Sequence, residues 1–204
     1  MKKLALLSVL AALTVLVGCG GGEKAPESCA PQAPAWKWTY TENPSLEGIP
    51  ANAVVGEADG RPFEVKAVIF EPLFGNWSME LCDTAPEEPL DIAFATEFLK
   101  IDLPWEIKAP MTITKPVDDY GMFQIKEHDS DDTTSWNSDV HMVLEITKWE
   151  TKPYDPEGDL FQVAGKASGK IYICFVGSAG FKNSGVAGTF TDAIIRYMGN
   201  PAEE

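Results

Sequence analysis

The sequence predicts an all-β protein, most simply an antiparallel β-sandwich, with a distorted barrel or a jelly roll as the alternatives. Three observations point to this class. Apolar and polar residues alternate with a period of two in many short stretches, and glycine- or proline-containing turns separate these stretches every 8–14 residues or so. No stretch beyond the N-terminal 19 residues keeps a helical period of 3.6 over about a dozen residues. Many short strands with regular turns are typical of sandwiches and barrels.

The first predicted elements lie between residues 36 and 69. Aromatic residues alternate with Lys37 and Thr39 over 36–40, which indicates a first strand. The Asp59-Gly60 pair is a hairpin turn signal between a strand over 53–58 and another over 63–69.

The remaining strands follow from the same alternation, and prolines divide them. Pro104, Pro110 and Pro116 exclude a long helix from the middle of the chain. The phase of the alternation slips between Phe98 and Leu99, which predicts a bulge or a bend. The predicted strands cover 76–82, 91–103, 111–114, 120–126, 140–149, 160–176 and 186–197.

Composition and charge limit the possible functions. With 45% hydrophobic residues, the chain can bury a sizeable core. Lys2 and Lys3 are the only charges in the first 19 residues, so the rest has two fewer than the 16 basic residues of the whole chain, against 31 acidic ones. This excess of negative charge argues against binding to nucleic acid or to anionic lipid surfaces, because both would repel it.

The N-terminus has the pattern of a secretory signal peptide. Lys2 and Lys3 precede an apolar run over 4–17, which has about 14 residues where a membrane-spanning helix needs roughly 20. The run ends in Leu16-Val17-Gly18-Cys19. This ending resembles the lipobox of bacterial lipoproteins, in which the cysteine carries the lipid and becomes the new N-terminus.

The resemblance divides the chain into three parts. It implies a signal peptide over 1–18, a lipidated and flexible tether over 19–35, and one β-sandwich domain over 36–204. Glycine and proline dominate the tether, as expected of a flexible or extended linker. The resemblance also implies a membrane partner through the lipid at Cys19 and a location in the bacterial cell envelope. Residues 20–22 lack the aspartate that acts as an inner-membrane retention signal in enterobacteria, which favours the outer membrane.

Three further cysteines remain in a chain that is expected to be exported, where disulfides persist. Cys82 and Cys174 lie in predicted strands, and we expect them to form a disulfide. The bridge would close a loop of about 92 residues and stabilise the fold by roughly 4–5 kcal/mol in the chain-entropy model. Cys29 lies in the predicted tether, where it could be free, pair with another chain, or compete for one of the other two.

An acidic stretch over 127–139 is the strongest candidate for a ligand site. Its carboxylates, Asp129, Asp131, Asp132 and Asp139, are hard oxygen ligands of the kind that calcium prefers. The stretch does not match an EF-hand, because Thr134 takes the place of the glycine and Val140 that of the bidentate glutamate. Calcium is therefore the one cofactor that the sequence suggests, and its site would be an irregular loop and not an EF-hand.

Trp136 stands in the middle of this polar stretch and, if exposed, could stack on a sugar ring.

The sequence shows no recognisable set of catalytic residues. His128 and His141 lack metal-ligand spacing, and Gly177-Ser178-Ala179-Gly180 does not match a nucleophile elbow. We therefore expect no enzymatic activity.

The sequence as a whole favours a lipid-anchored envelope lipoprotein that acts as a non-enzymatic binding or structural module. Its partner would be an envelope protein or another envelope component, and not nucleic acid. The alternative is a calcium- or glycan-binding module centred on residues 127–139.

Overall fold

The computed structural model describes residues 36–73, 75–90, 97–115, 120–126 and 133–200, which belong to the compact unit Trp36–Glu204. All regular structure in these ranges is β-strand, so the all-β prediction is confirmed. No helix in these ranges is long and apolar enough to cross a membrane. The ten strands are β1 (Val54–Ala58), β2 (Arg61–Glu64), β3 (Ala67–Leu73), β4 (Asn76–Cys82), β5 (Glu97–Leu103), β6 (Met111–Lys115), β7 (Tyr120–Lys126), β8 (Thr133–Thr151), β9 (Gln162–Phe175) and β10 (Ser184–Tyr197).

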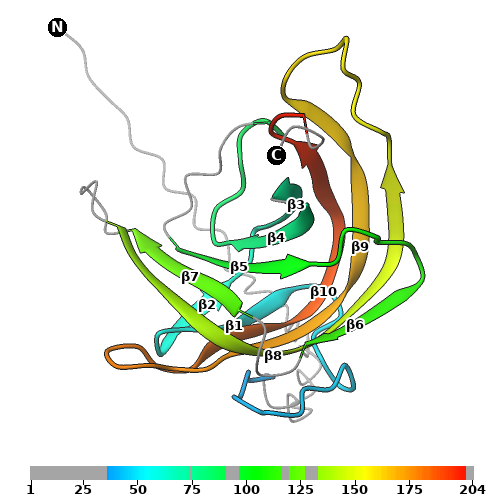
Figure 1. The fold of residues 1–204 in the computed structure, drawn as a ribbon. Helices are drawn as coiled ribbons and strands as arrows, with labels where there is room; N and C mark the ends of the chain where they lie inside the picture. Colours follow the sequence, from blue (N-terminus) through cyan, green and yellow to red (C-terminus); the bar gives the residue numbers. More distant parts are fainter. Residues whose placement is uncertain (1–35, 74, 91–96, 116–119, 127–132, 201–204) are drawn as a thin grey trace, which may run out of the picture. The chain divides into compact units, whose positions relative to one another are not determined.

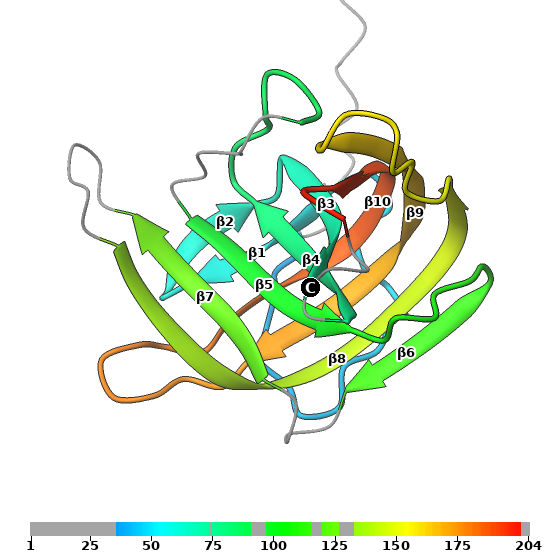
Figure 2. The same cartoon turned by 45° about the horizontal axis from the view of Figure 1, so that its top comes forward.

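The strand pairings form a closed circuit. Starting from β3, antiparallel pairs lead through β4, β5, β7, β8 and β9 to β10. The last link, between β10 and β3, is parallel and joins only Ile194 and Ile195 to Ile69 and Phe70. The strongly curved β8, β9 and β10 face β3, β4, β5 and β7 (Figures 1 and 2). The result is a sandwich whose two layers are joined on both sides, which is equivalent to a distorted barrel.

Two long strands each serve two partners on one side. The first half of β10 pairs with β1, which carries β2 beyond it, and the second half pairs with β3. The first half of β8 likewise pairs with β7 and the second half with β6. A register shift between Phe190 and Ala193 marks the change of partner in β10. Close approach of β1 to β10 requires glycine at position 188, because a Cβ there would collide with the Ala53 carbonyl.

The core fills the space between the two layers. Alternate side chains of the strands point inward, as the period of two predicts. The largest fully buried side chains are Phe70, Phe175, Ile69, Met79, Leu81, Leu99, Ile101, Leu103, Met142, Leu144 and Ile146. Of these, all except Ile69 belong to the single inner cluster.

Two smaller clusters lie outside this core. One contains Trp38, Cys174 and Ala187, and the other contains Ile69 and Cys82. Both are buried, although their residues alternate with inward-facing neighbours along the strands. The outer surface of the sheet is therefore covered in at least two places.

Most predicted strands are present, with shifted ends. Residues 36–40 form no strand, and the strand predicted over 63–69 is divided between β2 and β3. The predicted bulge between Phe98 and Leu99 is also wrong, because β5 keeps a continuous register with β4 and β7 there. The aromatic side chains of residues 36–40 alternate as predicted, but the segment packs through these side chains and not through a backbone ladder. In addition, β8 begins at Thr133, so the second half of the predicted acidic loop is strand.

Candidate functional site

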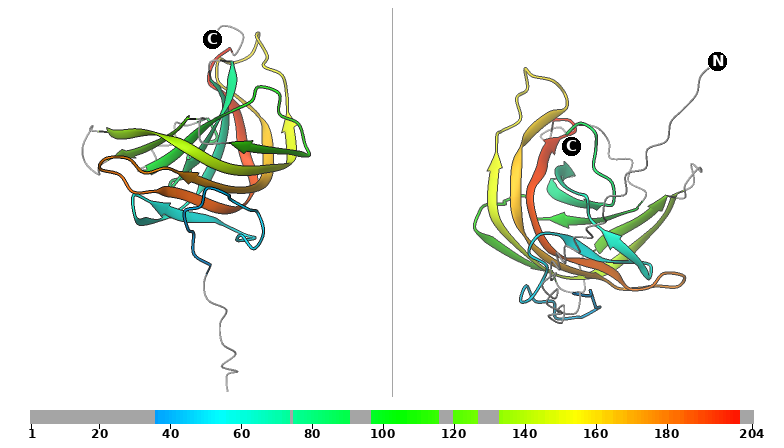
Figure 3. Two further views of the ribbon diagram at one scale, coloured as in Figure 1. Left: turned by 60° about the horizontal axis from the view of Figure 1, so that its bottom comes forward. Right: turned by 180° about the vertical axis from the view of Figure 1, so that it is seen from behind.

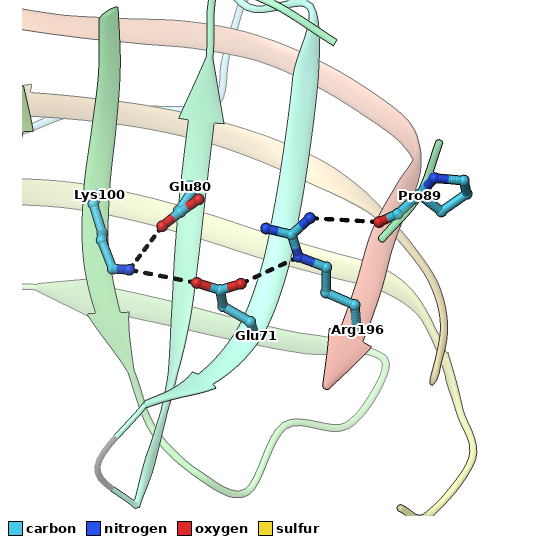
Figure 4. Close-up of polar contacts among 5 residues, drawn as sticks. All are labelled: Glu71, Glu80, Pro89, Lys100 and Arg196. Carbon is cyan, nitrogen blue, oxygen red and sulfur yellow. Dashed lines mark hydrogen bonds and ion pairs between the residues drawn. The ribbon is translucent and has the colours of Figure 1, made fainter. Parts of the chain in front are cut away.

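A network of four charged side chains lies on the outside of the sheet where the circuit closes. Glu71 on β3, Glu80 on β4, Lys100 on β5 and Arg196 on β10 alternate with core residues along their strands. Cross-strand register places Glu80 directly opposite Lys100. Figure 4 shows the four side chains in a row across the outer face.

The distances show that each charge has an opposite partner. Lys100 Nζ lies 2.7 Å from Glu80 Oε1 and 3.6 Å from Glu71 Oε1. Arg196 Nε donates to Glu71 Oε2 at 3.2 Å, and its Nη1 donates to the Pro89 carbonyl at 3.4 Å. Glu71 therefore joins the two cations, and Arg196 also holds the loop that follows β4.

The four charged side chains of the network are largely buried. The Arg196 side chain is 3% exposed, and those of Glu71, Glu80 and Lys100 are 15–16% exposed. Burial alone would lower the pKa of Lys100, but the carboxylates of Glu80 and Glu71 raise it above its ordinary value. Lys100 thus stays a cation at neutral pH. Its ion pairs with Glu80 and Glu71 suit a role in joining strands better than one in proton transfer or nucleophilic attack.

The N-terminal segment of the domain, residues 36–50, covers a second outer patch, and we call this segment the strap. Figure 3 (left) shows the strap, in blue, passing across the outside of the barrel. Trp38, Trp36, Tyr40 and Ile49 of the strap pack against Cys174, Ala187 and Tyr172 of β9 and β10. This patch is covered by aromatic and aliphatic side chains, with one ion pair at its rim, between Lys37 and Glu57 at 3.6 Å.

Cys174 lies at the centre of the strap-covered patch. Its thiol accepts the Thr41 N–H at 3.5 Å and lies 4.0 Å from the Thr39 carbonyl. His141 is directly opposite Cys174 in the β8–β9 register, and the Tyr40 ring meets its imidazole edge-on at 6.1 Å. Burial raises the pKa of the Cys174 thiol to about 11, so it is protonated and unreactive beneath the strap.

The predicted disulfide between Cys82 and Cys174 is wrong. Both residues are free and buried, and they belong to different outer clusters. Burial, together with the nearby carboxylates of Glu80 and Asp83, raises the pKa of the Cys82 thiol to about 12. Strand alternation places both cysteines on the outer face of the sheet, but it does not say whether they lie close together on that face. They lie in separate clusters, so no disulfide joins them. Cys19 and Cys29 lie outside the described residues.

The acidic stretch is only partly described. Asp129, Asp131 and Asp132 lie outside the described residues, and so does His128. Asp139 lies half-buried on β8 opposite Tyr120, and its carbonyl accepts the Val176 N–H at 3.0 Å. Among the residues that the structure describes, no three His, Cys, Asp or Glu side chains group as metal ligands. Calcium binding by the stretch stays a prediction.

The exposed tryptophan expected at position 136 is not found. Trp136 is 6% exposed, and its ring stacks on Phe181 at a centroid distance of 5.3 Å. It lies on β8, inside the acidic stretch, and belongs to the inner core cluster, so it offers no face to a sugar. The sequence did not indicate that Trp105 would be the exposed tryptophan, 44% exposed and stacked on Trp77.

An exposed apolar tip was also missed. Leu160, Phe161 and Val163, at the junction of the β8–β9 loop with β9, are 59%, 45% and 47% exposed. We call these three residues the apolar tip. In sequence they continue smoothly into the alternation of β9, so periodicity alone gives no sign that they lie beyond the core.

Comparison of the chain with protein-family models, with curated proteins and with solved structures finds no match.

Proposed function

We propose that the protein is a lipid-anchored lipoprotein of the bacterial cell envelope and that its domain is a non-enzymatic module that binds another envelope protein. The anchor rests on the lipobox-like Leu16-Val17-Gly18-Cys19 and the preceding signal-like segment. The binding role rests on the placement of the apolar tip relative to the strap. The anchor rests on the sequence alone and the binding role on the arrangement of the domain, so each has its own test.

The observation that carries the binding role is that the strap and the β8–β9 loop lie at opposite ends of the barrel. Figures 1 and 3 place the strap, in blue, at one end and this loop, in yellow, at the other. The predicted tether joins the domain at the strap, and its flexibility would leave the apolar tip, at the opposite end of the barrel, accessible to a soluble domain of a partner.

The loop that presents the apolar tip is held in place by one glutamine. Gln162 Nε2 donates to the carbonyls of Asp155 and Asp159 at 2.7 and 2.6 Å, and Gln162 Oε1 accepts the Asp155 N–H at 3.0 Å. A surface that is ordered before binding loses less conformational entropy on association. Exposed aliphatic and aromatic side chains beside acidic ones suit the apolar centre and polar rim of a protein interface.

A shallow groove adjoins the apolar tip. It has a volume of about 410 Å³, and its walls include Leu90, Pro153, Phe161 and Val163. Polar side chains, Lys152, Asp155, Asp159 and Gln162, line the rest of the groove. It would therefore suit a protein segment that places an apolar side chain at the centre and polar groups at the rim.

The anchor is tested by acyl labelling in a bacterial host. The wild-type chain should incorporate labelled fatty acid and sediment with membranes, and the variant Cys19→Ala should do neither. Cys29→Ala is the matched control, because it changes the other cysteine of the predicted tether and should leave labelling intact. Persistence of the label in Cys19→Ala would refute lipidation at this residue.

The binding role is tested by site-specific photo-crosslinking in the envelope. A photoreactive phenylalanine analogue at position 161 should give a discrete adduct with one protein, and the Leu160→Glu change should abolish it. The control places the analogue at Thr112, which is exposed on β6. Equal adducts at both positions, or none at position 161, would contradict the binding role without affecting the anchor.

The calcium alternative retains only its sequence argument from Asp129, Asp131 and Asp132. A thermal melt with calcium and with a chelator tests it directly. Ligand at 100 times its dissociation constant should stabilise the fold by about 2.7 kcal/mol, which is a shift of a few degrees at this size.

A further inference from the structure

We propose that the strap, residues 36–50, is a releasable cover that undocks as a unit while the barrel stays folded, and that its release uncovers the Cys174 thiol. This inference concerns the domain alone and does not depend on lipid anchoring or on a binding partner. It assigns to the protein a conformational switch that controls access to one buried thiol.

The strap is held to the described strands of the barrel without strand pairing. Side chains make its contacts with the barrel: Trp38 Nε1 donates to the Ile173 carbonyl at 3.3 Å, and the Tyr172 hydroxyl donates to the Thr39 carbonyl at 2.7 Å. Between the described residues, the strap shares no backbone ladder with any strand. Segments without such ladders open locally at a lower free energy than the strands beneath them.

The barrel closes without the strap. The circuit from β3 through β4, β5, β7, β8 and β9 to β10 is complete without it. The inner core likewise contains no strap residue among its buried members, because Trp38 belongs to the outer cluster with Cys174 and Ala187. Removing the strap from its patch therefore leaves the inner packing unchanged.

The strap covers a free thiol, that of Cys174. Cys174 is fully buried, yet it is on the outer face of β9, and its sulfur contacts the Thr41 N–H and the Thr39 carbonyl of the strap. Release would expose the thiol to water and remove the main cause of its raised pKa, which is burial. A larger fraction of thiolate, the nucleophilic form, would then be present at a given pH.

Cys82 provides an internal control. It is equally buried and free, but it packs with Ile69, Ala67 and Phe98 on β3 and β5, and no strap residue belongs to its cluster. A reagent that reaches thiols only through global unfolding would modify both cysteines together. A reagent that enters through strap release would modify Cys174 alone.

The experiment measures alkylation by N-ethylmaleimide in the full chain under native conditions, with the Cys174 and Cys82 peptides quantified separately by mass spectrometry. We expect Trp38→Ala to raise the Cys174 rate at least tenfold and to change the Cys82 rate less than twofold. Tyr172→Phe, which removes the hydrogen bonds of this hydroxyl to the carbonyl and the hydroxyl of Thr39, should raise the Cys174 rate a few-fold. Trp105→Ala is the matched control, because Trp105 stacks on Trp77 away from the strap and should leave the ratio of the two rates unchanged.

Two outcomes would overturn the proposal. If both thiols react faster together in Trp38→Ala, the strap is part of the global unfolding unit and not a separate cover. If neither variant changes the Cys174 rate, something other than the strap protects this thiol. Should Trp38→Ala fail to fold, the milder Tyr172→Phe decides between the same outcomes.

Discussion

Two patches on the outside of one sheet are buried by opposite physical means. Aromatic side chains of the strap cover the patch around Cys174, whereas the network of Glu71, Glu80, Lys100 and Arg196 occupies the patch at the β10–β3 seam. The strap contributes mainly apolar area, which is non-directional and roughly additive. The network depends on specific partners, so the loss of one member leaves a buried charge uncompensated.

The two patches should therefore differ in how easily they open. An apolar cover can leave its patch and return to it, because apolar burial is non-directional and needs no specific partner. A charge network at a short parallel seam has little freedom, because opening it would separate Arg196 from both Glu71 and the Pro89 carbonyl. We therefore expect the seam to open only with the whole barrel and the strap to open before it.

The largest expected effect is that of Glu71→Ala. This change removes the carboxylate that Arg196 Nε contacts and one of the two carboxylates that Lys100 contacts. Loss of one partner of a buried ion pair costs about 3–5 kcal/mol. Urea unfolding should show a lower midpoint with an unchanged slope. A loss below about 1 kcal/mol would show that water screens the network, and the contrast between the two patches would disappear.

A smaller effect is expected from alkaline pH. The folded thiols of Cys82 and Cys174 have pKa values of about 12 and 11, above their ordinary value, so the unfolded chain loses these protons first. Because the folded state then binds more protons, stability falls as the pH rises above about 8.5. Urea unfolding at pH 7, 9 and 10 should show this fall, and Cys82→Ala and Cys174→Ala should each reduce it by a similar amount, because both folded pKa values lie above this range. Equal slopes in wild type and both variants would contradict the assignment.

Lys100 adds a separate loss at higher pH. Its pKa in the folded state is raised above the ordinary value, so its contribution is complete below about pH 10.4 and disappears as the pH rises through the folded pKa. Lys100→Met removes this second fall but keeps the thiol-dependent one. A single fall shared by all variants would mean that the seam and the thiols titrate as one unit.

The smallest expected effect is that of Lys166→Ala. The Lys166–Asp192 pair has the same chemistry as the seam network, with a separation of 3.5 Å, but both side chains are more than 60% exposed. Exposed pairs contribute only about 0–1 kcal/mol. The urea midpoint should hardly move. A loss as large as that of Glu71→Ala would mean that burial is not what distinguishes the seam.

The class of fold could be predicted from sequence, and the covered patches could not. The alternation in β3, β4 and β5 marks which residues face the core, but it also predicts that Glu71, Glu80 and Lys100 face solvent. Their burial follows from the parallel β10–β3 pairing, which joins residues more than 100 positions apart. Cys82 on β4 and Cys174 on β9 lie in different clusters, with β3 and β10 between their strands in the circuit.

The strap shows a second limit of the sequence. Trp36, Trp38 and Tyr40 alternate as in a strand, because their side chains do line one surface of the segment. Alternation reports which side is buried and not whether the backbone is paired. Trp136 shows the reverse case, since the polar residues around it predict exposure while its strand position turns the ring into the core.

The most direct test of the contrast between the two patches is the urea dependence of alkylation of Cys174 and Cys82 in the wild-type chain. The slope of each rate reports the surface exposed in the opening that admits the reagent. We predict a shallow slope for Cys174 at low urea, as expected for release of the strap alone, and the full slope of global unfolding for Cys82. If the two thiols follow one line from zero urea to the midpoint, the strap and the seam open together, and the contrast between them is wrong.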